Sequence, residues 1–235
     1  MPKSPAATTS PPIHPMPFVR VELIVMSIQD ERLVILQGQR EQAPYAGRWA
    51  LPGGVLRIDL DKTLDDAVQR VAQERLAVQL PHVRQLAAVG GAKRDPRAPW
   101  ALSVVYRALV PMEAFAPTPG KRLASLRWVA AEAAVADTQL AFDHAQLIDQ
   151  AVRAMRKDVE ALDLPVGFLP LDFTLTELQQ ICEALLGHRL DKSSFRRKLE
   201  DRKLVAPVEG EMRAAGAHRP AQVFRLMSQL QVVIS

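Results

Sequence analysis

Cysteine is almost absent from this sequence: Cys182 is the only one in 235 residues. A single cysteine excludes a disulfide within the chain and a zinc site built from several cysteines, and such low usage is typical of a reducing compartment. Leu175 lies seven residues before Cys182 and Leu178 lies four residues before it, which is about two turns and one turn of a helix. All three therefore share a face of a predicted helix. We therefore expect a small buried side chain rather than a reactive thiol.

Long apolar runs are absent as well. No stretch of about 18 consecutive apolar residues occurs, so no transmembrane helix is predicted. Residues 1–17 have neither the apolar core of a secretory signal nor the arginines of a transit peptide. Their richness in Pro, Ser and Thr instead predicts a disordered tail. We expect a cytoplasmic protein without a membrane partner.

The remaining composition is that of an ordinary globular protein. Hydrophobic residues make up 48% and charged residues 24%, which is enough to bury a core in one large domain or in two smaller ones. The formal net charge is +4 and the sequence pI is about 9.5. This charge permits a polyanionic partner but does not require one.

The stretch LPGGVLRIDLDKTLDDAVQRVAQERLAV, residues 51–78, joins a glycine turn to an amphipathic helix. Thr63 stands three residues before Asp66, which is typical of a helix N-cap with an acidic partner. From Leu64 onward the apolar residues recur at the spacing of one buried helical face. The residues left on or near the opposite side are Arg70, Gln73, Glu74 and Arg75.

This stretch resembles a Nudix box, whose family pattern is G-x5-E-x7-R-E-U-x-E-E-x-G-U with U apolar. Gly54 matches the glycine and Arg70 matches the arginine, with two additional residues between them. The first glutamate of the E-E pair is matched by Glu74. The positions that differ from the pattern are Lys62, Val71, Arg75 and Ala77.

The differences remove most of the carboxylates that an active Nudix helix uses to hold Mg²⁺ against a diphosphate. Such a hard cation needs several oxygen ligands, and Glu74 is the only ligand-type residue that the helix keeps. Lys62 and Arg75 also bring positive charge, which opposes cation binding. We therefore expect no catalytic residues, no bound metal and no hydrolysis. The alternative is a rearranged metal site made from Asp59, Asp61, Asp65 and Asp66.

The segments around this stretch predict a mixed sheet with helices, an α/β (α+β) fold over residues 18–163. Alternating or continuous apolar runs predict strands at residues 18–26, 32–41, 82–90, 101–110 and 123–129. An apolar stripe predicts a long helix from Phe142 to Leu162. His144, at the start of that helix, has no second ligand at metal spacing, so we expect it to pack or to cap.

The loop GAKRDPRAPW, residues 91–100, carries three cations close together. Lys93, Arg94 and Arg97 stand beside Asp95 and Trp100. This mixture could grip a phosphate and stack a base or a ribose. An equally good interpretation is a solvated polar hairpin loop.

A second domain is predicted at residues 172–228, after a linker at residues 164–171 that contains two prolines. Thr174, three residues before Glu177, is typical of a capping box, and Gly187 is expected to end that helix. A second helix follows at SSFRRKLEDR, and LVAPV and QVFRL predict a two-stranded hairpin. Helix, turn, helix and hairpin is the order of a winged helix-turn-helix, whose second helix enters the DNA major groove.

Positive charge is concentrated in this second domain. From His188 to Arg225 there are ten Lys and Arg against five Asp and Glu, an excess of +5 in a chain whose total is +4. Such a local excess is what phosphate binding requires. Phe195 and Leu199 are expected to face the core, so the other side of their helix is free for DNA. The residues that we expect to contact DNA are Lys192, Ser193, Ser194, Arg196, Arg197, Lys198 and, on the wing, Arg219.

The run FTLTELQQICEALLGHRLDKSSFRRKLEDRKLV followed by HRPAQVFRL resembles the C-terminal domain of the Nudix-related transcriptional regulator family, and RDPR and LAFDH are also similar to that family. The resemblance covers about Phe18 to Leu226. It implies a homodimer that binds a double-stranded DNA operator and represses genes of NAD metabolism. It also implies a Nudix-like domain that senses ADP-ribose or a related nucleotide as effector, without any cofactor. The ligand contacts that we expect are Trp49, Gly53, Gly54, Arg70, Glu74 and Arg94.

Two other functions remain open. The first is a Nudix hydrolase of nucleoside diphosphate derivatives with an accessory nucleic-acid-binding module, which would release AMP from ADP-ribose when a divalent cation is present. The second is a noncatalytic adaptor whose winged helix binds protein, which would show no salt-sensitive DNA binding.

Overall fold

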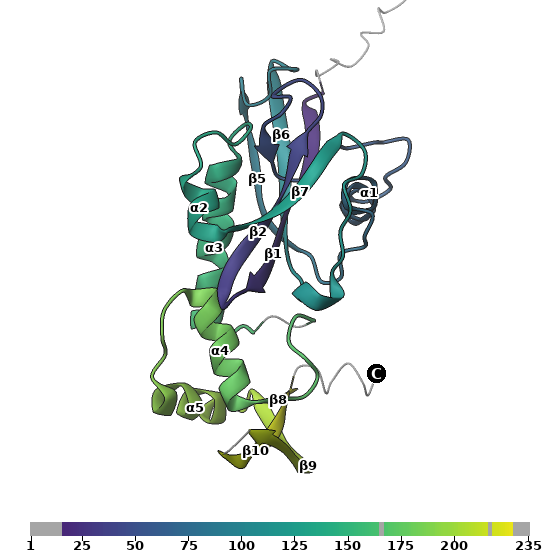
Figure 1. Ribbon diagram of the computed structural model, residues 1–235. Helices are drawn as coiled ribbons and strands as arrows, with labels where there is room; N and C mark the ends of the chain where they lie inside the picture. Colours follow the sequence, from purple (N-terminus) through teal and green to yellow (C-terminus); the bar gives the residue numbers. More distant parts are fainter. Residues whose placement is uncertain (1–15, 165–166, 216–217, 228–235) are drawn as a thin grey trace, which may run out of the picture.

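The computed structural model describes residues 16–164, 167–215 and 218–227. The tail predicted over residues 1–17 lies outside the described residues except for its last two. A sheet domain with helices on both faces is followed by a small domain built from α4, α5 and three strands (Figure 1). No helix in the described part of the chain has the length and apolar character needed to cross a bilayer.

Seven strands form one mixed sheet in the described part of the first domain. They are β1 (Phe18–Gln29), β2 (Arg32–Arg40), β3 (Trp49–Ala50), β4 (Gly53–Val55), β5 (Arg84–Ala92), β6 (Trp100–Leu109) and β7 (Leu123–Ala130). The order along the sheet is β3-β2-β1-β6-β5, with β4 also paired to β1 and β7 to β2. Only β1 and β6 run parallel among these pairs. The mixed sheet expected from the sequence is confirmed.

Both faces of β1 are covered, because helices lie on either side of the sheet (Figure 1). Ile24 and Met26 point into a core with α3 (His144–Glu160) and the short α2 (Ala131–Ala136). Val21, Leu23 and Val25 alternate with them and point into a second core with α1 (Leu64–Leu76). The alternation follows from the two-residue period of a strand. The short helix α2 and the 3-10 turn at Met112–Ala114 were not predicted.

Helix α1 begins with the predicted capping box: Asp66 N donates to Thr63 Oγ1 at 3.1 Å, and Thr63 N donates to Asp66 Oδ2 at 2.9 Å. Its apolar residues are buried as the spacing predicted. The placement of Arg75 on the open side was wrong, since only 9% of this residue is exposed. The reason is tertiary: the segment before β7 folds back over the end of α1, where Gly120 N donates to the Arg75 carbonyl at 2.9 Å.

The second domain has the predicted order of elements. It consists of β8 (Phe173–Thr174), α4 (Leu175–Leu186), α5 (Lys192–Asp201), β9 (Val205–Ala215) and β10 (His218–Leu226). The capping box of Thr174 with Glu177 is present, and Gly187 caps α4 with a left-handed φ of 79°. The hairpin strands are longer than predicted. Their pairing is irregular near Gly210, where the Gln222 side chain donates to two carbonyls of β9.

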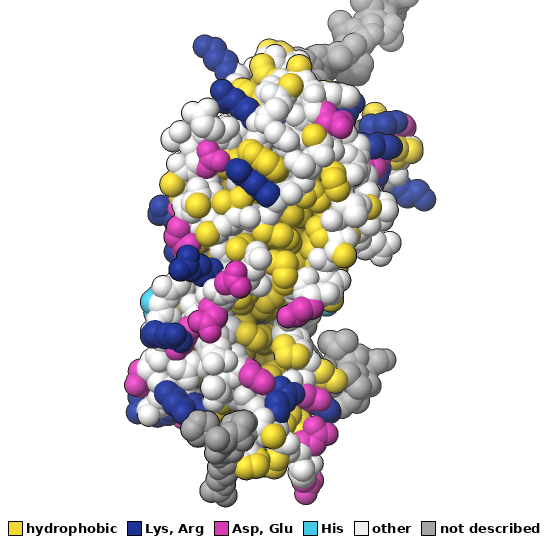
Figure 2. Space-filling model, viewed as in Figure 1, with side chains coloured by type: hydrophobic (Ala, Val, Ile, Leu, Met, Phe, Trp, Pro, Cys, Tyr) yellow, Lys and Arg dark blue, Asp and Glu magenta, His cyan; other side chains and the backbone are white. Residues whose placement is uncertain are grey.

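One apolar core runs through both domains. Helix α4 contacts β1, β2 and α3, and its buried Leu178 and Leu185 belong to the same cluster as Ile24 and Ile35 of the sheet. The segment predicted as a linker contributes the buried Leu164 and Leu169 to this cluster. On the face shown in Figure 2, apolar side chains gather in a band that runs from the sheet domain toward the second domain. Cys182 is buried in the shared core, and burial raises the pKa of its thiol to about 12, which confirms its predicted packing role.

Candidate functional site

Five arginine side chains line one hollow beside the turn between β3 and β4. The hollow is shallow, with a volume of about 30 Å³, and is open to solvent. Its arginines come from five separate segments of the chain: Arg20, Arg40, Arg75, Arg97 and Arg122. A guanidinium presents a planar set of donors that matches phosphate oxygens, so this concentration of arginine favours a phosphorylated ligand.

Carboxylates balance only part of this positive charge. Arg20 Nε donates to Glu22 Oε1 at 2.7 Å. Arg97 donates to the buried Asp95 through its side chain at 2.8 Å and through its backbone N–H at 3.0 Å. Arg40 donates instead to a backbone carbonyl at 2.7 Å. Burial, together with the charges of Arg20 and Arg97, lowers the pKa of Arg40 to about 10.

Glu22 and His144 form a buried polar pair next to the hollow. His144 Nδ1 accepts a hydrogen bond from Leu51 N at 2.8 Å, so the neutral ring carries its proton on Nε2, which lies 3.8 Å from Glu22 Oε2. Burial lowers the pKa of His144 to about 4. Burial alone would raise the pKa of Glu22, but Arg20 and His144 hold it below its ordinary value. The prediction that His144 packs rather than binds a metal agrees with its 1% exposure.

Two of the predicted ligand residues, Gly53 and Gly54, form the short strand β4 against β1. A Cβ atom at Gly53 would lie 2.0 Å from Glu22 Oε2, and one at Gly54 would lie 2.7 Å from a methyl group of Val71, so only glycine fits at either position. Gly53 lines the arginine hollow. Gly54 is buried beneath α1.

Arg94 and Trp49 lie near the hollow but do not line it. Arg94 donates to both carboxylate oxygens of Asp143, at 2.8 and 2.9 Å, and to Ser103 Oγ at 2.5 Å. The Trp49 ring lies under the guanidinium of Arg127, 4.1 Å from the ring centroid. Arg94 therefore ties its loop to the start of α3. The loop joins the antiparallel strands β5 and β6 as a hairpin, and most of its residues, including Lys93 and Trp100, are exposed as the hairpin interpretation expected.

Arg70 and Glu74 form a separate cluster on α1. Arg70 donates to both oxygens of Asp61, at 2.6 and 2.7 Å, and to the Val55 carbonyl at 2.9 Å. Glu74 lies 3.5 Å from Arg70 and 3.4 Å from Lys121. The structure thus brings these two predicted residues together, but neither lines the hollow.

Of the four carboxylates considered for a rearranged metal site, two are paired with arginines and Asp66 is engaged in the cap of α1. Asp61 binds Arg70, and Asp59 binds Arg57. Across residues 16–164, 167–215 and 218–227, no group of three or more His, Cys, Asp or Glu side chains is arranged to hold a metal ion. The residues of α1 and its preceding loop do not fit a magnesium site, because their charged side chains neutralise one another.

Four arginines of the hollow were missed by sequence reasoning, whereas Gly53 was an expected ligand contact and Arg97 was one of the cations of the expected phosphate-binding loop. Arg20 and Glu22 stand on β1, where charged residues within an otherwise apolar strand were the available signal. Arg40 and Arg122 carried no local signal, since they end or precede strands in the manner of ordinary surface residues. Only folding brings them beside the glycine turn.

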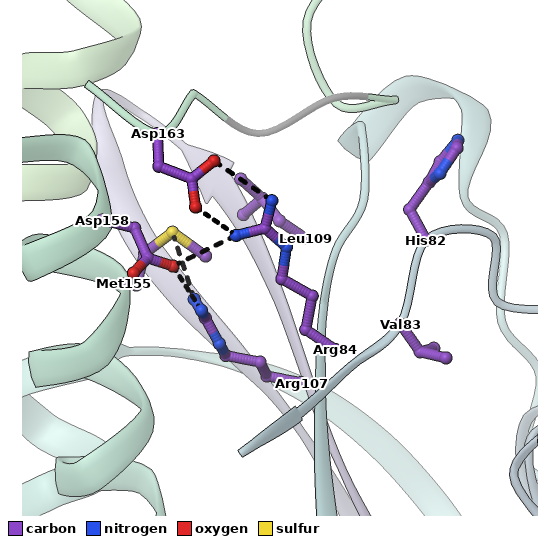
Figure 3. A pocket seen from close by; sticks show the side chains of 8 residues that line it. All are labelled: His82, Val83, Arg84, Arg107, Leu109, Met155, Asp158 and Asp163. Carbon is purple, nitrogen blue, oxygen red and sulfur yellow. Dashed lines mark hydrogen bonds and ion pairs between the residues drawn. The ribbon is translucent and has the colours of Figure 1, made fainter. Parts of the chain in front are cut away.

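A second hollow, of about 230 Å³, lies where β5 and β6 face the end of α3 (Figure 3). Arg84 Nη1 lies 2.6 Å from Asp163 and 3.5 Å from Asp158. Arg107 also binds Asp158 and approaches the Met155 sulfur (Figure 3). Because each charged group here has an opposite partner, the cluster joins the sheet to the segment before the second domain and is a poor site for a charged ligand.

Helix α5 presents a cationic face. Asp191 caps it by accepting from Ser194 N at 2.8 Å, and Phe195 and Leu199 are buried as predicted. Of the residues expected to contact DNA, four are exposed: Lys192, Ser193, Arg197 and Lys198. Ser194 and Arg196 are half-buried. The side chain of Arg219, on β10, lies outside the described residues.

Both halves of the chain match known families. Residues 165–226 match the model of the NrtR DNA-binding winged helix domain, and residues 16–151 match the model of the NUDIX domain. The chain is similar to the "ADPR responsive transcriptional repressor NtrR" of Acinetobacter baylyi, with 36% identity over 216 residues, which are 92% of this chain and 84% of that protein.

Solved structures give the same result. The chain is similar to Shewanella oneidensis NrtR in a crystal structure with a 27mer DNA, with 33% identity, a TM-score of 0.71, and coverage of 88% of this chain and 93% of that chain. Its first domain is similar to the NUDIX domain of the same protein in a cocrystal structure with ADP ribose, with 31% identity and a TM-score of 0.56. That match covers 63% of this chain and 94% of that chain.

Proposed function

The chain belongs to the NrtR family, with a NUDIX domain followed by an NrtR DNA-binding winged helix domain, and from this premise we propose that it is a DNA-binding transcriptional repressor that responds to ADP-ribose. The observation that carries the proposal is the exposed cationic face of α5. The domain of α5 shares an apolar core with the sheet domain, and the sheet domain contains the arginine-lined hollow. The relative from Acinetobacter baylyi is named for both properties.

In this proposal α5 is the recognition helix. Phe195 and Leu199 hold its inner face in the core, which directs the opposite face outward. Lys192 and Lys198 contribute charge for phosphates, and Arg197 is placed to contact base edges in the major groove. Ser193, Ser194 and Arg196 complete the surface, and Arg219 extends it to the wing. Similarity to a structure with bound DNA supports this assignment.

In the proposed dimer, the effector acts by changing the position of the two winged helix domains, one from each chain. A ligand shifts a conformational equilibrium only if it binds one form more tightly than the other. Helix α4 packs on β1, β2 and α3, so a movement of the sheet domain around its ligand is passed directly to the second domain. The sequence led us to expect ligand contacts from Trp49, Gly53, Gly54, Arg70, Glu74 and Arg94. Of these, Gly53 lines the arginine hollow, and we assign the ligand to the surface around that hollow.

The active form is a cytoplasmic homodimer in this proposal, and its targets are genes of NAD metabolism. A dimer presents two recognition helices to two half-sites, which is how paired helix-turn-helix domains bind. The apolar band in Figure 2 is a surface that a second copy can cover. ADP-ribose is what remains of NAD after nicotinamide is removed, so sensing it reports on NAD turnover.

Binding measurements test the function directly. A binding sequence is first selected from a random DNA library, and its affinity is then measured by fluorescence anisotropy with and without ADP-ribose. We expect salt-sensitive binding of the selected DNA, and we expect ADP-ribose to weaken it and to raise the melting temperature of the free protein. Panels of NAD, ATP and nucleoside diphosphate sugars serve as controls. No thermal shift with any nucleotide at millimolar concentration would remove the sensing role.

The NUDIX match also raises hydrolysis as a candidate activity, and we expect none with ADP-ribose and Mg²⁺. The Nudix box is degenerate: Val71 and Arg75 replace two carboxylates, and the remaining Glu74 is held by Arg70 and Lys121. AMP release is measured by chromatography after incubation with Mg²⁺ or Mn²⁺. Turnover of about 1 per second or faster, as in ordinary enzymes, would show that the chain is a hydrolase.

A further inference from the structure

We propose that the five-arginine hollow binds the diphosphate of the effector without a divalent cation, and that Arg75 supplies the positive charge at a position where the Nudix pattern has a carboxylate for the metal. The hollow is defined by Arg20, Arg40, Arg75, Arg97 and Arg122. This inference rests on the proposed function, because it takes the effector to be a nucleoside diphosphate derivative.

The hollow has more arginines than carboxylates, so its net positive charge favours binding of an anion. Glu22 and Asp95 are the carboxylates paired with its arginines, and they engage Arg20 and Arg97. In the part of the chain that the structure describes, the other three arginines have no carboxylate within ion-pair distance: Arg40, Arg75 and Arg122. Like charges that share one hollow repel one another, and a ligand with two phosphate charges relieves that repulsion.

Arg75 is built into the hollow rather than loosely attached to it. Its Nε donates to the Gly53 carbonyl at 2.9 Å, and its Nη1 donates to the Lys121 carbonyl at 2.7 Å. These two bonds fix the plane of the guanidinium, and they leave Nη2 without a hydrogen bond in the described part of the chain. Burial, followed by the charge of Arg122, lowers the pKa of Arg75 from its ordinary value, so an anion beside it is favourable. The side chain is thus oriented before a ligand arrives.

The carboxylates near the hollow on α1 and its preceding loop are not free to bind a divalent cation. Glu74 is engaged by Arg70 and Lys121, and Asp61 is engaged by Arg70. A cation beside Gly53 would also meet Arg75 and its neighbouring guanidiniums, which repel it. Metal ions and arginine forks are two of the ways in which proteins bind phosphate groups, and of these two only the arginines are present in this hollow.

The expected result is that ADP-ribose binds equally well, within about twofold, in EDTA and in Mg²⁺. Isothermal titration calorimetry measures both affinities on the full chain. Arg75→Glu and Arg122→Glu are each expected to weaken ADP-ribose and ADP by roughly 10-fold to 150-fold, the loss of a charge-assisted hydrogen bond. Arg122 is exposed, and its side chain makes no hydrogen bond within the described residues, so its variant keeps the test valid if Arg75→Glu fails to fold.

Lys62→Glu is the matched control. It makes the same change in charge, and it restores a carboxylate of the Nudix pattern, but Lys62 is exposed and does not line the hollow. Its affinity for ADP-ribose is expected to equal that of the wild type. Adenosine, which has no phosphate, is expected not to compete.

The outcomes separate this inference from the proposed function. If ADP-ribose binding requires Mg²⁺, or survives unchanged in both arginine variants, the hollow is not the diphosphate site although the sensor role stands. If ADP binds through these arginines but ADP-ribose does not bind, the diphosphate site is supported and the proposed effector is wrong. If neither ligand binds the wild type, both are wrong.

Discussion

Replacing Arg197 by alanine is expected to lower affinity for the selected operator by roughly 5-fold to 150-fold, the loss of about 1–3 kcal/mol that one bidentate contact to guanine contributes. Affinity for scrambled DNA of the same length should fall much less. Arg197 is exposed on α5, whereas the neighbouring Arg196 is half-buried with its Nε enclosed, so the orientation of the helix favours Arg197 as the residue that contacts bases.

Lys192→Ala is the matched control on the same helix. A lysine that contacts only phosphate should weaken binding to operator and scrambled DNA alike and should reduce the salt dependence by about one charge. Arg219→Ala on the wing is expected to behave in the same way. Fluorescence anisotropy at two salt concentrations on both DNAs gives the comparison. Equal losses on operator and scrambled DNA for both Arg197→Ala and Arg196→Ala would mean that α5 does not recognise sequence.

Acidification from pH 6.5 to pH 4 is expected to lower the free energy of unfolding by up to about 3 kcal/mol through His144 alone. The unfolded chain protonates this histidine near its ordinary pKa, but burial lowers the pKa in the folded protein to about 4. Between those values the unfolded state binds more protons, so stability falls as the pH falls. Glu22 and Asp143 favour the charged ring and Arg20 and Arg94 oppose it, and none of these outweighs burial.

The variant His144→Asn isolates this effect. Asparagine Oδ1 can accept the Leu51 N–H in place of His144 Nδ1 but does not titrate. Urea unfolding at pH 7, 6 and 5 should therefore show a stability that declines for the wild type and is nearly constant for the variant. The pKa values of Glu22 and Asp95 are held below their ordinary values, so their contributions are lost only at lower pH. Parallel declines in both proteins would exclude His144 as the cause.

Local signals in the sequence were sufficient for α1, α3, α4 and α5, although not for the short α2. Thr63 and Thr174 predicted their capping boxes because a cap depends on residues only three apart, and Gly187 predicted the end of α4 for the same reason. The burial of Phe195 and Leu199 followed from helical spacing. These features are decided within one or two turns of chain, where spacing alone carries the information.

The sensor site was not predictable in this way, because its contacts join distant segments. Arg94 is held by Asp143, 49 positions away along the chain, so its role as a tie between a loop and α3 leaves no trace in local composition. Arg75 followed the amphipathic pattern of α1, but the return of the chain before β7 buried it. Arg20 and Glu22 were hidden on a strand that is covered on both faces.

The core shared by the two domains has a consequence for how the molecule folds. Leu164, Leu169 and Phe173 lie where a boundary between domains was predicted, yet all three are buried in one cluster with the sheet. Cutting the chain there would expose these side chains to water. The segment between the two domains is therefore part of the packing that holds α4 against the sheet, so a truncation of Leu164, Leu169 or Phe173 is expected to weaken the packing of both domains.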